Sequence, residues 1–229
     1  MSSTHHPAYV HHFENLGEQK EAATFGMWVF IAQEILFFGG LFGAYAVYRN
    51  LHPEAFYYGS HHLNIPLGAF NTAVLICSSL TMALGVHAAA LGKRTQIVGW
   101  LLATVFLGSV FLGIKVVEYK EKFDHHLVPG TSFDASQLHM ESIEDPALLA
   151  KAHKAAQIYY SLYFSMTGLH ALHMIIGIPI ILWIAARAWL GQFGPEYHSP
   201  VEIVGLYWHF VDIVWIFLFP LLYLIPKPH

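Results

Sequence analysis

Charged residues are scarce in this sequence. Asp, Glu, Lys and Arg together make up 11% of its 229 residues, whereas hydrophobic residues make up 55%. Soluble domains carry about 25% charged residues, so the composition predicts a membrane protein. The net charge of −4 is spread along the chain without a basic patch, and this argues against a nucleic-acid partner.

Three other features are missing. The chain has one cysteine, Cys77, inside an apolar run, so neither a disulfide framework nor a thiolate metal cage is available. The polar segment 1–24 lacks the basic region and apolar core of a secretory signal, so we expect the first apolar stretch to be retained. Strand-like alternation is absent as well, which argues against a transmembrane β-barrel.

Long apolar runs dominate what is present. A hydrocarbon core of about 30 Å needs roughly 20 apolar helical residues. The stretches long enough to cross it are 25–48, 66–91, 97–117, 157–186 and 201–225. The sequence therefore predicts an all-α, polytopic membrane protein, with a polar N-terminal segment (1–24) followed by a single bundle of five transmembrane helices (25–229). The charges of the connecting loops do not decide its orientation.

The segment 118–156, between the third and fourth spans, is polar. Its first part, "IKVVEYKEKF", continues the third span without a helix breaker. Its last part, "EDPALLAKAHKAAQ", offers Asp145 as a helix cap and Pro146 as the first helical residue. We therefore predict a projecting helical hairpin that turns in "LVPGTSF".

The last span has its own start signal, "SPVE". Ser199 is expected to cap the helix, Pro200 to occupy its first turn and Glu202 to complete a capping box.

Ionisable side chains fall near the middle of three spans. They are Glu34, His170, His173, His209 and Asp212. A charged group at the centre of a membrane helix costs about 2.5–3.5 kcal/mol on insertion scales, and such groups face the bundle interior or a water-filled cavity. We therefore expect these five residues to form a shared polar layer.

This layer raises three chemical interpretations. A haem b site needs facing imidazoles, but His170 and His173 point the same way, so at most one could pair with His209. A membrane di-metal oxygenase needs many clustered histidines; one HxxH with Glu34 could make only a lone metal site. A transporter would show matching broken helices in its two halves, and Pro179 has no such counterpart.

Helix packing is the strongest interpretation from the residues alone. Small residues and interhelical hydrogen bonds hold membrane helices together. Gly39, Gly40 and Gly43 are expected to form a close-approach face on the first span. The second span has a similar set: Gly68, Asn71, Ser78, Ser79 and Thr81. His209 and Asp212, three residues apart, could contact one another or reach another helix.

Several strings resemble one family, subunit III of the haem–copper (cytochrome c) oxidases. The strings are "FIAQEILFFGGLFGAY", "FNTAVLICSSLTMA", "FLGIKVVEY", "FSMTGLHALHMIIG" and "YWHFVDIVWIFLF". They follow the family's order and span nearly the whole membrane region. The chain is similar to the short bacterial form, because it lacks the first two of the seven spans in the fuller form.

The resemblance implies a non-redox core subunit of a proton-pumping oxidase in aerobic respiration. Its partners would be oxidase subunits I and II, with haem and copper in those subunits and no cofactor or metal in this chain. It also implies a bacterial plasma membrane location with a cytoplasmic N-terminus, contact with membrane lipids including bound phospholipid, and a role in the stability and proton uptake of subunit I. Association with other respiratory complexes is compatible with it.

The resemblance also implies roles for individual residues. Glu34 matches the family's buried reactive carboxyl, while Asn71, Glu118, His170, His173, His209 and Asp212 match its other buried polar positions. Glu118 and Tyr119 are expected to end the third span at the interface. Lys115 stands where many members have glutamine, and a lysine there could extend to the headgroups. Subunit III of a quinol oxidase and an accessory subunit of nitric oxide reductase remain alternatives.

Overall fold

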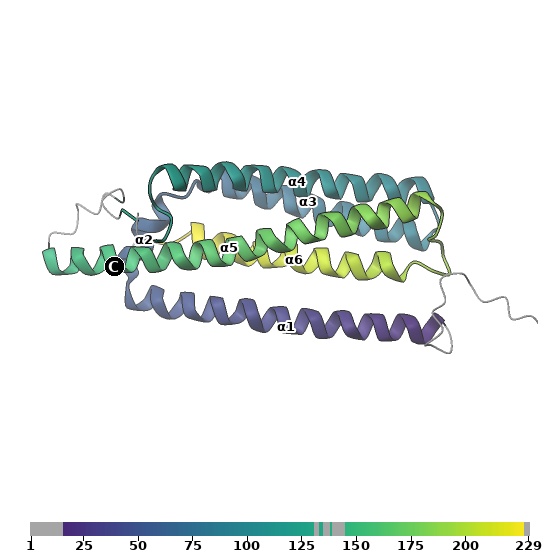
Figure 1. The fold of residues 1–229 in the computed structure, drawn as a ribbon, viewed down its shortest axis with the longest axis horizontal. Coiled ribbons are helices and arrows are strands. Elements are labelled where there is room, and N and C mark those ends of the chain that lie inside the picture. Colours follow the sequence, from purple (N-terminus) through teal and green to yellow (C-terminus); the bar gives the residue numbers. More distant parts are fainter. Residues whose placement is uncertain (1–15, 131–132, 135–137, 139–144, 227–229) are drawn as a thin grey trace, which may run out of the picture.

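The structure, a computed structural model, describes residues 16–130, 133–134, 138 and 145–226. In this part of the chain the helices, in order, are α1 (Leu16–Leu51), α2 (Pro53–His61), α3 (Ile65–Ala90), α4 (Arg94–Asp124), α5 (Pro146–Trp189) and α6 (Ser199–Tyr223). Figure 1 shows the long helices running side by side, with α2 short and at one end.

Five of these helices, α1, α3, α4, α5 and α6, are long and apolar enough to cross a membrane. They contain or closely match the five predicted spans, so the predicted all-α, polytopic fold is confirmed. Helix α1 begins earlier than expected, at Leu16, because "EQKEAA" holds good helix formers and no breaker. Residues 1–15 of the predicted polar segment lie outside the described residues.

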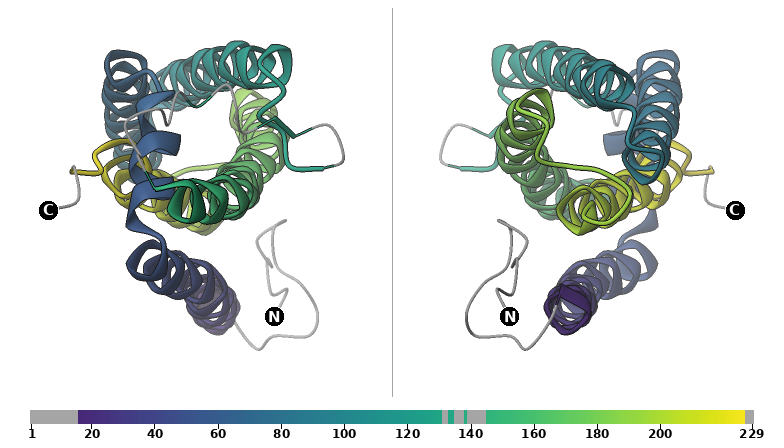
Figure 2. Two further views of the ribbon diagram at one scale, coloured as in Figure 1. Left: turned by 90° about the vertical axis from the view of Figure 1, so that its left-hand side faces the viewer. Right: turned by 90° about the vertical axis from the view of Figure 1, so that its right-hand side faces the viewer.

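The end-on views show how the helices are arranged (Figure 2). Helices α3, α4, α5 and α6 form a ring in which each packs on its two neighbours. Helix α1 lies outside this ring and contacts α5 and α6. The α3–α4 and α5–α6 connections lie at the same end as the start of α1, and α2 lies at the opposite end (Figure 1).

The predicted helical continuation beyond the third and fourth spans is confirmed. Helix α4 runs to Asp124 and α5 begins at Pro146, where the Asp145 side chain accepts a hydrogen bond from the Ala147 N–H at 2.9 Å. Helix α5 extends past the end of α4 (Figure 1). Part of the predicted turn, residues 131–132, lies outside the described residues, but Leu127 is fully buried, so the connection folds back onto the bundle.

Helix α2 was missed by the sequence analysis, because nine residues are too few for a span. It carries Phe56, which is fully buried between Tyr45 of α1 and Tyr159 of α5, with ring centroids 5.2 Å from each. The carbonyl of Gly59 accepts a hydrogen bond from the Tyr160 hydroxyl at 3.2 Å. Helix α2 therefore joins α1 to the ring at this end.

The predicted capping box of the last span is wrong. Ser199 is already the first helical residue, and the N-cap is His198, which makes no side-chain cap. Glu202 instead contacts two cationic or titratable side chains, Lys20 at 2.9 Å and His198 at 3.2 Å. With Ser199 inside the helix, its hydroxyl does not occupy the position from which an N-cap reaches the first-turn N–H groups.

The predicted glycine face of α1 is also wrong as a contact within this chain. A Cβ added at Gly39, Gly40 or Gly43 would meet nothing within 4 Å. Helix α1 contacts the rest of the bundle through a different side, which carries the buried Ile31, Glu34, Phe38 and Tyr45. These larger residues set the distance between α1 and the ring, and the glycines remain exposed.

Candidate functional site

Glu34 and His173 form the polar contact between α1 and the ring. The Glu34 carboxyl is 9% exposed, and its Oε2 lies 3.4 Å from the His173 Nε2. The His173 Nδ1 lies 2.9 Å from the Leu169 carbonyl oxygen, which only accepts, so Nδ1 carries a hydrogen. The carboxyl and Nε2 can therefore bond only by sharing a proton, held by one or the other.

Aromatic side chains enclose this pair. The rings of Phe38 and Tyr207 lie 5.8 Å and 6.3 Å from the His173 ring. The Tyr207 hydroxyl donates a hydrogen bond to the His173 carbonyl at 2.9 Å, so α6 also fixes this part of α5. Glu34 is thus buried, as expected, and it lies beside a histidine of α5.

His209 and Asp212 link α6 to α3. The His209 Nδ1 lies 2.7 Å from the Ser79 hydroxyl oxygen, which comes from the middle of α3. Asp212 is 2% exposed and lies near the same serine, but neither of its carboxyl oxygens makes a hydrogen bond with the described residues. Of the two contacts that the sequence left open for His209, the structure shows the one to another helix.

His170 lies inside the ring of helices. It is 1% exposed, and its Nε2 lies 3.1 Å from the Val211 carbonyl oxygen, so Nε2 is the donor. The rings of Phe111 and Trp215 lie 5.3 Å and 5.2 Å from the imidazole. Its Nδ1 has no hydrogen-bond partner among the described residues, and the two aromatic rings pack beside the imidazole.

The predicted shared polar layer is divided in the structure. Glu34 and His173 lie between α1 and α5, whereas His209 and Asp212 lie beside Ser79 of α3. Among the described residues, no hydrogen bond or ion pair joins these two groups. Within the same residues, no group of three or more His, Cys, Asp or Glu side chains could hold a metal ion. The expectation that this chain binds no haem or copper stays a prediction.

Lys115 and Glu118 form a buried charged cluster, a pairing that the sequence did not reveal although Glu118 was expected to be buried. The Lys115 ammonium is 3.1 Å from the Glu118 Oε2, 3.2 Å from the Tyr163 hydroxyl and 3.0 Å from the Tyr223 hydroxyl. The Glu118 Oε1 accepts hydrogen bonds from the same two tyrosines. The cluster therefore ties α4 to α5 and α6.

Aromatic faces surround the ammonium of this cluster. Lys115 Nζ lies 5.0 to 5.7 Å from the ring centroids of Trp215, Tyr163, Tyr119 and Tyr223. Such distances are typical of cation–π interactions, which strengthen when the cation is desolvated. Lys115 is 3% exposed and Glu118 is 1% exposed.

Two expectations about this region are therefore wrong. Lys115 does not extend to the headgroups, because it faces the interior of the ring, where an anion and two hydroxyls already meet its donors. Glu118 is buried, as the resemblance implied, but it does not end the span at the interface. The Tyr119 hydroxyl lies 2.6 Å from the Thr167 hydroxyl of α5 and hydrogen-bonds to it. The three-residue spacing of Lys115 and Glu118 was the signal that could have indicated this pair.

The second-span polar residues pack inside the bundle, as predicted. A Cβ added at Gly68 would lie 2.8 Å from the Phe219 ring, and Ser78 accepts a hydrogen bond from the Trp208 indole at 2.9 Å. Asn71 is 1% exposed, and in the described part of the chain its side-chain amide has no hydrogen-bond partner.

Comparison with known proteins decides the family. The family model described as cytochrome c oxidase subunit III matches residues 11–125 and 138–226. The chain belongs to this family. A cytochrome c oxidase subunit 3 from Corynebacterium diphtheriae is 33% identical over 202 residues, covering 87% of this chain and 86% of the relative. One from Thermostichus vulcanus is 32% identical, covering 92% and 90%.

The subunit III relatives also include a quinol enzyme. A cytochrome bo(3) ubiquinol oxidase subunit 3 from Pseudomonas aeruginosa is 28% identical, covering 87% of this chain and 83% of the relative. The family resemblance seen in the sequence is thus confirmed, together with a multi-pass membrane fold for a subunit of an oxidoreductase complex.

Proposed function

We propose that this chain is the non-redox subunit III of a proton-pumping cytochrome c oxidase in a bacterial plasma membrane. It packs on subunit I, which together with subunit II carries the haem and copper, and its N-terminus lies in the cytoplasm. Its role is to keep subunit I stable during turnover and to support proton uptake. Family membership and the names of the relatives from Corynebacterium diphtheriae and Thermostichus vulcanus support the assignment.

The Glu34–His173 contact is the observation that carries the proposed role. It places a carboxyl and an imidazole 3.4 Å apart within membrane-spanning helices, at the junction of α1 with the ring. The outer side of α1 is broadly apolar, with Phe25 71% and Leu36 77% exposed. A polar contact that fixes α1 would therefore also fix the apolar surface available to subunit I and to lipid.

The test of this role is the functional lifetime of the complex. Glu34→Ala is expected to leave the oxidase assembled and spectrally intact, yet to shorten its active lifetime during turnover. Gln33→Ala, the exposed neighbour on the same helix, is the matched control and should leave the lifetime unchanged. Loss of assembly in Glu34→Ala, or an unaltered lifetime, would contradict a functional carboxyl.

Asp212 is expected to behave in the opposite way. Because it is buried beside Ser79 between α3 and α6, Asp212→Ala should weaken the fold of this subunit. Less subunit III should then be retained on purification, with normal activity in each complex that keeps it. Full retention of the subunit in an active complex would contradict this structural role.

A quinol donor is the second candidate, favoured by the relative from Pseudomonas aeruginosa. The electron donor would contact other subunits of the complex, so an assay of the purified complex has to distinguish cytochrome c from quinol. The purified complex should oxidise reduced cytochrome c; oxidation of ubiquinol in its place would assign the second candidate.

A further inference from the structure

A cavity lies between α1, α3 and α6, at the end of the bundle where α1 and α6 begin (Figure 1). It has a volume of about 420 Å³, which leaves room for several water molecules at about 30 Å³ each. Ala83 of α3 and Gly205 of α6 line its apolar part. Of the α6 residues that line it, His209 lies furthest from the start of the helix, so the imidazole marks the inner end of the cavity.

The outer part of the cavity is polar. Lys20 and Thr24 of α1 and Glu202 of α6 line it. The Lys20 ammonium lies 2.9 Å from one Glu202 oxygen, and the other oxygen lies 3.2 Å from the His198 Nε2. The side chains of Lys20 and Glu202 are 48% and 33% exposed, so water solvates these charges at the mouth of the cavity. The cavity is therefore continuous with the aqueous phase at this end.

His209 connects this cavity to the polar group inside the bundle. It follows Glu202 by seven residues, which places it about 10 Å further along α6 at a rise of about 1.5 Å per residue. Its Nδ1 lies 2.7 Å from the Ser79 hydroxyl oxygen, and its Nε2 makes no hydrogen bond within the described part of the chain. An imidazole can accept a proton on one ring nitrogen and donate one from the other.

Asp212 is a buried acid one turn beyond His209, near the middle of α6. It is 2% exposed and lies near Ser79, but its two carboxyl oxygens make no hydrogen bond with the described residues. Helix α3 contributes no Asp, Glu, Lys or Arg, and the charges of Lys20 and Glu202 lie at the mouth of the cavity. A carboxylate without a partner is costly at this depth, so the Asp212 carboxyl holds a proton.

We propose that His209 and Asp212 form a proton-binding site that exchanges with the aqueous phase through this cavity. As Asp212 gives its proton to the Ser79 oxygen, Ser79 gives its own to the His209 Nδ1, and the imidazolium releases the Nε2 proton to water. A proton from water returns by the reverse steps, and rotation of the imidazole brings either nitrogen to Ser79. The site is separate from Glu34 and does not depend on the proposed oxidase role, because exchange requires no turnover.

The test is hydrogen–deuterium exchange of the Asp212 carboxyl, followed by infrared spectroscopy of the intact resting complex in bilayer nanodiscs. The C=O stretch of a protonated carboxyl is distinct from the carboxylate bands and shifts when the proton is replaced by a deuteron. The Asp212 band is assigned by its loss in Asp212→Asn. On transfer to D2O we expect this band to shift well before the backbone amides of the spanning helices exchange. His209→Phe should abolish the fast shift.

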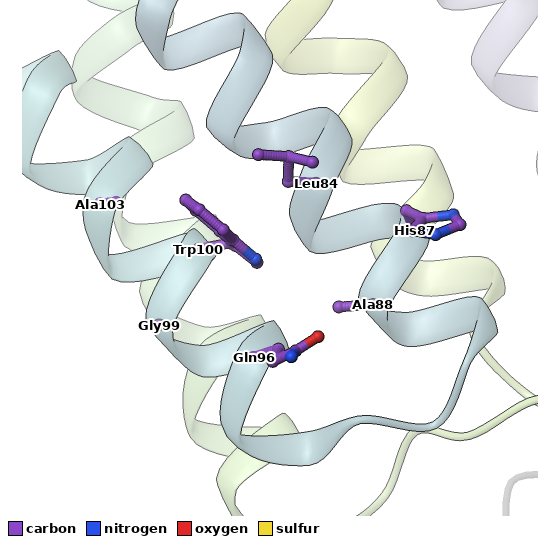
Figure 3. Close-up of a pocket in the computed structure, with 7 residues that line it drawn as sticks. All are labelled: Leu84, His87, Ala88, Gln96, Gly99, Trp100 and Ala103. Carbon is purple, nitrogen blue, oxygen red and sulfur yellow. The ribbon is translucent and has the colours of Figure 1, made fainter.

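A pair of alanine variants tests the route without changing the two titratable side chains. Ala83 lines the cavity, whereas Ala103 lines a separate recess between α3 and α4, which Figure 3 shows. Ala83→Leu should slow the shift to the rate of the backbone amides, and Ala103→Leu should leave it fast, with equal subunit content in both. Equal rates in the two variants, a slow shift in the unaltered complex, or no band lost in Asp212→Asn would overturn the proposal.

Discussion

Lys115 occupies a position where a lysine would be strongly unfavourable without partners. Its ammonium is inside the ring of helices, but a carboxylate, two hydroxyls and four aromatic faces surround it. Replacing one member of such a buried pair leaves an uncompensated charge and typically costs about 3–5 kcal/mol, whereas the pair as a whole is only weakly stabilising. The two residues therefore have to be considered together.

Removing the anion of this pair should be strongly destabilising. We expect Glu118→Ala to lower the free energy of unfolding of the subunit by about 3–5 kcal/mol, because the Lys115 ammonium then has no counterion. Lys115→Gln should cost less, since Glu118 keeps its two tyrosine donors. The measurement is loss of the subunit from the detergent-solubilised complex on heating.

Glu121 provides the control for that experiment. It lies one turn further along α4, with a side chain that is 51% exposed and 3.9 Å from the Lys122 ammonium. The buried Lys122 ammonium also donates to the His62 carbonyl, and the Glu121 carboxylate is half-exposed, so Glu121→Ala should cost less than Glu118→Ala. Equal losses for Glu118→Ala and Glu121→Ala would contradict the structural importance of the buried pair.

At the scale of the elements, Trp208 determines how closely α6 approaches its neighbours. A Cβ added at Gly108 of α4 would lie 2.9 Å from the indole, and one added at Gly177 of α5 would lie 2.9 Å from it as well. The indole is fully buried and donates to Ser78 of α3. One side chain of α6 thus contacts all three other helices of the ring.

The two glycines beside Trp208 should tolerate no added methyl group. Gly177→Ala and Gly108→Ala are each expected to destabilise the subunit by about 1–3 kcal/mol, the usual range for overpacking. Gly113→Ala, on α4 but facing open space, should have little effect. For each of the three variants, the measurement is the temperature at which half of the subunit has dissociated from the complex. An unchanged midpoint for Gly177→Ala would contradict this expectation and show that the Trp208 indole can move.

At the scale of the whole molecule, the apolar runs were sufficient to predict the fold class. Each predicted span lies within, or within two residues of, a helix of the structure, because about 20 apolar residues are needed whatever the packing. Asp145 and Pro146 also marked the start of α5 correctly. The length of an apolar run and the residues that cap a helix depend only on neighbouring residues, so both can be read from the sequence.

Which side of a helix faces which neighbour was harder to predict. The glycines of α1 indicated a contact, but larger residues on another side of α1 made it. Lys115 was expected at the interface, and the sequence did not reveal its buried partners. Tyr163 and Tyr223 are 48 and 108 residues away along the chain, so no local pattern connects them to Lys115. Such contacts depend on the rotation of each helix, which several partners determine together.

This chain is expected to belong to a multi-subunit oxidase complex. This expectation is tested most directly by mass spectrometry of the proteins that copurify with the chain after gentle detergent extraction. We predict recovery of a large many-span, histidine-rich subunit and a copper-binding subunit, in equal amounts with this chain. Recovery of the chain alone, with stoichiometric haem or iron bound to it, would contradict the account.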